Sequence, residues 1–241
     1  MVPYITRIKQ RNALVREPVS LTVYPRLISV DGVDGSGKST LTAWLGRTLQ
    51  LIYGQDLVIT YEVTNLRGSP GQDRLRRLLE QGKLASEDLC YLAGLSRAYQ
   101  ELVEPALSVG KIVIVDRSEV DLLRFSLEGG NQIELRRRKQ AIASGVVTHG
   151  VWPKYRILVG ASVSDVWLNL QSRGTNSSYD PQSLDEVKRR VTAHEQALGM
   201  LLGFPYLGRS ELIGVFNRRA TLAVDEQFRS LAYEIATLMS F

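Results

Sequence analysis

Cysteine and histidine are almost absent from this 241-residue sequence, which contains one Cys and two His. Cys90 cannot form an intrachain disulfide, so nothing indicates an oxidising compartment, and so few thiol and imidazole groups argue against a structural zinc site. No apolar run approaches the roughly 18–20 residues that span a bilayer. The N-terminal stretch also lacks the apolar segment of a secretory signal. We therefore expect a cytoplasmic protein without a membrane partner, although the basic, acid-poor start weakly resembles an organellar transit peptide.

Internal repeats, low-complexity tracts and Gly/Ser-rich linkers are also missing, so no boundary divides the bulk of the chain. Much of the net charge of +5 comes from residues 1–25, in which four basic residues face Glu17 alone. We read residues 1–25 as a basic, poorly ordered N-terminal extension and residues 26–241 as one domain. The remaining positive excess is small, and we expect no nucleic-acid partner.

Short β-branched apolar runs alternate with longer helical patterns, which is typical of a parallel sheet covered on both faces. Ser183 to Glu186 has the form of a capping box and predicts a helix to about Leu198. A final helix is indicated by an apolar stripe from Val224 to Leu238. The pattern predicts an α/β fold with a doubly wound, five-stranded parallel sheet and helices on both faces. The predicted strands are 27–31, 57–62, 111–115, 155–160 and 211–216.

A polar segment and a histidine add detail. Residues 172–182 are polar and rich in Gly, Asn and Pro, and predict a short exposed lid loop. In the helix that begins at Ser183, His194 lies on the apolar stripe, where a packed core histidine is expected in preference to a catalytic one.

The segment Gly32–Thr40 matches the phosphate-binding pattern G-x-x-x-x-G-K-[ST] and lies between a predicted strand and a predicted helix. Gly35 and Gly37 permit positive φ, so that successive backbone N–H groups converge on a phosphate beneath a helix N-terminus. Lys38 would reach the β- and γ-oxygens, and the Ser39 hydroxyl would bind Mg²⁺. The motif predicts a P-loop NTPase fold with ATP and Mg²⁺ as cofactors, held by Gly32, Asp34, Gly35, Ser36, Gly37, Lys38, Ser39 and Thr40.

Asp116 and Arg117 follow four apolar residues, which places them at the carboxyl end of a buried strand. Open α/β sheets bind ligands at that edge. A carboxylate there can reach the Mg²⁺ shell together with Ser39, and the neighbouring guanidinium can bind the phosphate of an acceptor. The pair predicts a phosphotransferase site.

Over about residues 27–240 the order of these motifs resembles the thymidylate kinase family. That family has an acid before the P-loop glycine and a second acid inside the loop, here Asp31 and Asp34. It also has a Pro-Ala-Leu segment before a strand, an Asp-Arg pair at the end of that strand and a Trp-Pro entry to the next. These occur here at Pro105–Leu107, Asp116–Arg117 and Val151–Pro153.

The resemblance implies roles for individual residues. Asp34 would contact the acceptor sugar or Mg²⁺, and Arg117 would hold the acceptor phosphate. Arg173 in the lid would neutralise transition-state charge, and Arg218 would border the adenine. With Lys38 and Asp116, these form the predicted catalytic and donor-binding set. The predicted substrate-binding set is Arg67, Tyr91, Arg97, Arg117, Asp121 and Phe125.

Departures from the family pattern concentrate on the acceptor side. Asn65 occupies the family's first-loop arginine position, and Arg67 could supply that charge from a shifted position. Counting back from Pro105 puts Tyr91 at the thymine-stacking aromatic but Leu95 at the thymine-binding arginine, with Arg97 about 200° around a helix from the required direction. Further along, Ser118 replaces an aromatic, Asp121 a serine, Ser126 a glutamine and Ser178 a lid arginine.

We therefore expect ATP-dependent phosphoryl transfer to a nucleoside monophosphate, with thymidylate as the default acceptor. Two alternatives remain open: a P-loop kinase for another nucleotide or nucleoside, and a non-catalytic nucleotide-binding regulatory module. A homodimer is expected by resemblance alone.

Overall fold

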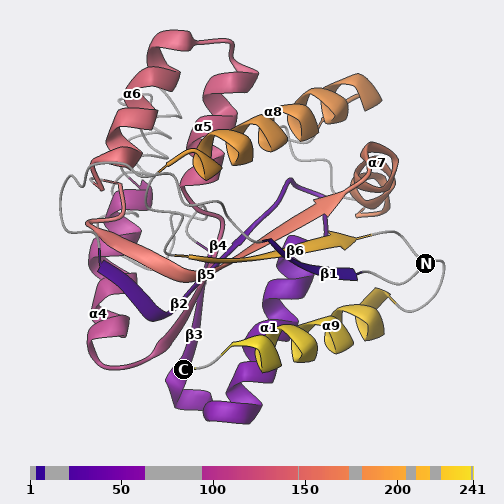
Figure 1. The fold of residues 1–241 in the computed structure, drawn as a ribbon. Coiled ribbons are helices and arrows are strands. Elements are labelled where there is room, and N and C mark those ends of the chain that lie inside the picture. The colour runs from indigo at the N-terminus through magenta and orange to yellow at the C-terminus, as the bar shows by residue number, and fades with distance from the viewer. Residues whose placement is uncertain are drawn as a thin grey trace, which may run out of the picture.

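A computed structural model of the chain describes residues 4–8, 22–62, 94–145, 147–173, 181–204, 210–217, 224–239 and 241. Its centre is a six-stranded sheet in the order β1-β6-β5-β2-β4-β3 (Figure 1). The five strands from β2 to β6 run parallel to one another, as the sequence predicted. They are β2 Thr22–Asp31, β3 Val58–Glu62, β4 Ile112–Asp116, β5 Val151–Ala161 and β6 Glu211–Asn217.

The sixth strand was not predicted. β1 (Tyr4–Ile8) pairs antiparallel with β6, with Tyr4 opposite Phe216 and Ile8 opposite Leu212. Part of the segment that we read as a poorly ordered extension thus forms the edge of the sheet. β2 also crosses the predicted boundary at residues 25 and 26. The division of the chain at that boundary stays a prediction.

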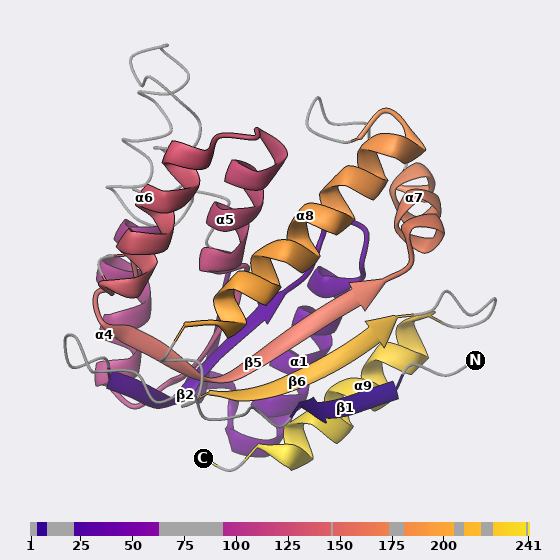
Figure 2. The ribbon, with the colours of Figure 1, turned by 45° about the horizontal axis from the view of Figure 1, so that its top comes forward.

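Alternation along the strands sends apolar side chains to both faces of the sheet. Ile28, Val30 and Ile114 contribute to one buried cluster with α1 (Lys38–Tyr53) and α9 (Val224–Leu238). Leu27 and Val113 point to the opposite face and pack with the remaining helices. Figure 2 shows α1 and α9 below the sheet and α5 and α8 above it. This two-sided cover is the predicted doubly wound arrangement.

The upper face carries most of the helices. A π-helical turn η2 (Tyr99–Val103) continues into α4 (Glu104–Ser108), which packs near β4 and β2. After β4 come α5 (Glu119–Glu128) and α6 (Gln132–Ala143), and after β5 come α7 (Val163–Ser172) and α8 (Leu184–Leu202). A short 3₁₀ turn η1 (Gln55–Leu57) leads into β3.

The predicted helix starts are largely confirmed. Ser183 caps α8 by accepting a hydrogen bond from the Glu186 N–H at 3.2 Å, and the Glu186 carboxylate accepts from the Gln182 N–H at 2.9 Å. The helix runs to Leu202, four residues beyond its predicted end. On α9 the stripe holds for Phe228, Leu231 and Ile235, but Leu238 is 39% exposed.

Candidate active site

The loop after β2 forms a cradle whose shape depends on glycine. Gly35 and Gly37 have φ of 88° and 92°, in the left-handed region that glycine tolerates. A Cβ at Gly32 would lie 2.6 Å from the Val159 carbonyl oxygen, so any larger residue would clash with the backbone there. The Asn169 amide on α7 donates to the Gly35 carbonyl at 2.8 Å and anchors the loop from the side.

The N-terminus of α1 opens directly onto this cradle. Gly37 is its N-cap, and among the described residues no side chain caps it. The first N–H groups of the helix are therefore available to an anion, which the helix dipole also favours. Ser39 is exposed and Thr40 partly exposed at this end. The predicted phosphate-binding segment thus has the open donors and the close backbone approach that a nucleotide phosphate needs.

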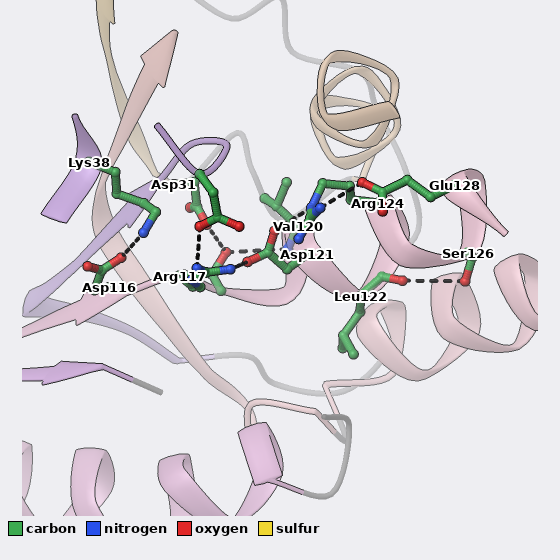
Figure 3. Close-up of polar contacts among 12 residues, drawn as sticks. Asp31, Lys38, Asp116, Arg117, Val120, Asp121, Leu122, Arg124, Ser126 and Glu128 are labelled. Atoms are coloured by element: carbon green, nitrogen blue, oxygen red, sulfur yellow. Dashed lines mark hydrogen bonds and ion pairs between the residues drawn. The ribbon is translucent and has the colours of Figure 1, made fainter. Parts of the chain in front are cut away.

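Lys38 and Asp116 meet at the base of the cradle. The Lys38 ammonium lies 2.5 Å from the Asp116 carboxylate, and both side chains are almost fully buried (Figure 3). Asp116 is the last residue of β4, and it stands beside Val30 of β2 in the parallel register. Asp116 ends β4, and Lys38 follows the loop after β2, so the pair lies at the carboxyl edge of the sheet. Open parallel sheets bind ligands at that edge.

Arg117 connects the P-loop with α5. Its guanidinium forms one ion pair with Asp34 and a second, at 3.4 Å, with Asp121. It is one of two non-glycine residues in the described chain with positive φ, at 76°. The structure therefore brings Asp34, Asp116, Arg117 and Asp121 together with Lys38, and their roles in a site stay predictions.

A second arginine, Arg124 on α5, also pairs with Asp121. Arg124 binds Asp121 at 2.9 Å and Glu128 at 2.6 Å (Figure 3), and its guanidinium lies 4.4 Å from the centre of the Phe125 ring. Burial opposes ionisation of Asp121, but the positive charges of Arg124 and Arg117 hold the pKa of its carboxyl well below the ordinary value. Asp121 is thus a carboxylate between two guanidinium groups, and Phe125 lies against one of them.

A buried polar layer lies directly beneath these residues. Arg156 of β5 is fully buried and forms an ion pair with the equally buried Glu119, the first residue of α5. It also lies 3.8 Å from the carboxylate of Asp31, which accepts a hydrogen bond from the Ser118 hydroxyl at 2.7 Å. Burial raises the pKa of Asp31 from 3.8 to about 7, against the opposing charge of Arg156.

His194 of α8 is buried near the same residues, as expected for a core histidine. Neither ring nitrogen has a hydrogen-bond partner among the described residues. Burial lowers its pKa from 6.5 to about 4, against the attraction of Asp121. The ring is therefore neutral at pH 7.

Other predicted site residues are not joined to this group. Arg97 is 54% exposed, and its described ion-pair partner is Glu101, on the same helix, at 3.1 Å. Leu95 is fully buried in the core, and Arg173 is exposed at the end of α7. Arg67, Tyr91, Arg218 and residues 174–180 of the predicted lid lie outside the described residues.

Sequence reasoning missed Arg124, Arg156 and Glu119. Arg124 could have been found, since acids three residues before it and four residues after it are placed to pair with it on a helix. Arg156 stood inside an apolar strand pattern, and a charge in a buried strand requires a partner. Its partner Glu119 is 37 residues away in sequence, and nothing local in the sequence identifies it.

The family model for thymidylate kinase matches residues 30–164, a span that contains the P-loop, the Asp116–Arg117 pair, α5 and β5. The chain belongs to the thymidylate kinase family. The thymidylate kinase of Ralstonia pickettii is 30% identical over 163 residues, which are 66% of this chain and 77% of that protein. The thymidylate kinase of Ruegeria pomeroyi is 38% identical over 95 residues, 37% of this chain and 43% of the relative.

A crystal structure of thymidylate kinase from Ehrlichia chaffeensis resembles this chain with a TM-score of 0.57 and 17% sequence identity. The match covers 91% of this chain and all of that one, and it shows a shared fold. The aligned segment spans less than half the length of several curated family members, 43% for the Ruegeria pomeroyi protein and 46% for one from Bordetella pertussis.

Within the part of the chain that the structure describes, no cluster of three His, Cys, Asp or Glu could hold a metal ion by itself. No described helix is both long and apolar enough to cross a membrane.

Proposed function

We propose that this chain transfers the γ-phosphoryl group of ATP to thymidylate and so converts dTMP to dTDP. The observation that carries the proposal is the convergence of Lys38, Asp116 and Arg117 on the glycine cradle. Family membership supports the same reaction, because the relatives that match are named thymidylate kinases.

On the donor side, backbone N–H groups of Gly35 to Lys38 would bind the β-phosphate, and Lys38 would reach the γ-phosphate. Lys38 is bound to Asp116 in this structure, so nucleotide binding would reorganise that ion pair. Ser39 and Asp116 fit Mg²⁺ as oxygen ligands, and Mg²⁺ would neutralise charge on the transferring group.

On the acceptor side, Arg117 would bind the phosphate of dTMP and align it with the γ-phosphoryl group. Asp34 and Asp121 hold the guanidinium at the P-loop before the acceptor arrives, so little reorganisation is needed. Catalysis would come from alignment and charge neutralisation, since phosphoryl transfer asks little covalent chemistry of the protein.

The experiment is a coupled assay of ADP release with dTMP, dUMP, UMP, CMP, thymidine or no acceptor, each with Mg²⁺ and with EDTA. Fastest turnover with dTMP and Mg²⁺ supports the proposal. Preference for another acceptor would indicate a P-loop kinase of different specificity. ATP binding with no acceptor-dependent ADP release would indicate a regulatory module and contradict the proposed activity. Dimerisation and the compartment of the protein stay predictions.

A further inference from the structure

The backbone of Arg117 has a conformation that needs support from its surroundings. Its φ of 76° lies in the left-handed region, where a residue with a long side chain is strained. Such a conformation persists only where neighbouring contacts hold it. One of these is the bond from the Arg117 N–H to the Val30 carbonyl at 2.9 Å.

The residues after Arg117 join a buried group that we name the Arg156 cluster: Ser29, Asp31, Ser118, Glu119 and Arg156. All five are between 0% and 2% exposed. The Ser118 hydroxyl donates to Asp31 at 2.7 Å and accepts from the Val120 N–H at 3.4 Å. Because Asp31 is the last residue of β2, this bond ties the start of α5 to the start of the P-loop.

Arg156 closes the cluster from β5. One terminal nitrogen lies 3.4 Å from the Ser118 hydroxyl and 3.5 Å from that of Ser29, and the other binds Glu119. The guanidinium also lies 4.5 Å from the centre of the Trp152 ring. A single cation thus holds the two residues that directly follow Arg117 in the chain.

We propose that the Arg156 cluster is a positioning device for Arg117. It fixes residues 116–119 so that the strained backbone directs the Arg117 guanidinium at Asp34 and the P-loop. Ser118 and Arg156 are positioning residues that act through Arg117. The inference rests on the proposed function for its kinetic consequence, but its geometric consequence needs no substrate.

The first test is geometric and uses Ser118→Ala, which removes the hydroxyl and its contacts with Asp31, the Val120 N–H and Arg156, but no charge. A crystal structure of this variant without ligand is expected to show Arg117 at negative φ and separated from Asp34. An unchanged φ and an intact Arg117–Asp34 contact would overturn the inference. This readout decides the inference even if the wild-type protein does not phosphorylate dTMP, an outcome that would contradict the proposed function alone.

The second test is kinetic and compares two buried arginines. Arg156→Met and Ser118→Ala are expected to raise KM for dTMP about 10-fold while KM for ATP changes less than about 2-fold. Arg138→Met is the control, because Arg138 is 1% exposed and binds the Leu122 carbonyl of α5 at 2.7 Å. It should lower the melting temperature without changing either KM. If Arg156→Met does not fold, Ser118→Ala carries the comparison.

A double-mutant cycle separates positioning from general loosening. Adding Ser118→Ala to Arg117→Ala is expected to change KM for dTMP less than about 2-fold, because the residue through which Ser118 acts is already gone. A further rise as large as that in the wild-type background would show that Ser118 acts independently of Arg117. Equal rises in KM for ATP and dTMP would likewise overturn the inference.

Discussion

At the scale of single residues, Lys38 differs most from what its motif suggests. A P-loop lysine is expected to face ligand, but here it is 4% exposed and bonded to Asp116. Removing one member of a buried ion pair leaves the other charge buried and uncompensated. Lys38 therefore contributes to folding as well as to the proposed chemistry.

We predict that Lys38→Met abolishes phosphoryl transfer and lowers the free energy of unfolding by about 3–5 kcal/mol, because the Asp116 carboxylate loses its partner. Urea denaturation measures the stability, and the coupled assay measures the activity. Adding Asp116→Asn should recover stability but not activity. A single variant as stable as wild type would show that the ion pair does not support the fold.

His194 makes a prediction about pH. Its pKa falls from 6.5 unfolded to about 4 folded, so the unfolded chain binds more protons between these values. His194 by itself should therefore lower stability by about 3 kcal/mol as the pH falls from 6.5 to 4. Asp31 acts in the opposite direction over the same range, because its pKa rises from 3.8 to about 7 on folding and the folded chain then binds more protons. His194→Leu should remove the His194 contribution alone, so the variant should gain stability relative to wild type by about 3 kcal/mol between pH 6.5 and pH 4.

The measurement is urea denaturation at half-unit pH steps from 4 to 8. The exposed Thr192 is on the same helix, so Thr192→Leu controls for adding a leucine to α8. The control should keep the wild-type slope between pH 4 and 6.5. A His194→Leu curve parallel to wild type would mean that the ring is not held neutral by burial.

At the scale of elements, the helix before β4 carries Leu95 and Arg97, the two positions that bear on how a thymine ring would be recognised. Leu95 is fully buried, so an arginine at that position would place a charge in the core. Arg97 is largely exposed and paired with Glu101. Arg97 thus lies at the surface, and Leu95 has no hydrogen-bonding side-chain group to offer a base.

We predict that Arg97→Ala changes kcat/KM for dTMP less than about 2-fold. Arg117→Ala should lower it at least about 10-fold, since of the two only Arg117 is proposed to make a charge-assisted contact with the acceptor phosphate. The assay should include dUMP, dCMP and dGMP to measure base discrimination. A collapse of dTMP preference in Arg97→Ala alone would establish Arg97 as the thymine-reading residue.

The parallel strands could be predicted from sequence because each is a local run that contains β-branched apolar residues. The π-helical turn at Tyr99–Val103 could not, because its residues are compatible with an ordinary α-helix and no local signal marks the wider turn. β1 was missed for another reason. Its five residues do not form a long apolar run, and its partner β6 lies about 200 residues later in the sequence.

Truncation of residues 1–9 tests the contribution of β1. The loss of its ladder with β6 should lower the free energy of unfolding on the order of 2 kcal/mol. It should also leave the edge of β6 open to pairing between molecules. Light scattering would then detect self-association that grows with concentration. Truncation of residues 1–3, before the strand, is the control and should leave the protein monodisperse to the same degree as wild type.

At the scale of the whole molecule, ligand binding and folding should be linked. With MgATP at 100 times its dissociation constant, the folded state gains about 2.7 kcal/mol. For a domain of this size that corresponds to a rise in melting temperature of about 5–10 °C. Differential scanning fluorimetry with MgATP, ATP plus EDTA and MgADP measures the shift. No rise with MgATP would contradict binding at the P-loop.

As with the fold, one part of the candidate site could be predicted from sequence and another part could not. Gly32–Thr40 and Asp116–Arg117 could be identified from sequence because short motifs specify them and each follows a strand. The contacts of Asp121 with Arg117 and Arg124 required the turn of α5, and the Arg156 cluster required three strands to be adjacent. Charges far apart in sequence give no local signal of their pairing.

The pairing of β1 with β6 also has a consequence for synthesis on the ribosome. β1 is synthesised before the other described strands, but its ladder cannot form until the partner residues of β6, such as Phe216 opposite Tyr4, have been translated. β2 can pair with β4 and β5 before that, so the parallel core is able to assemble first. β1 is then the last of the described strands to join the sheet, and its ladder partner is absent from the nascent chain until β6 has been made.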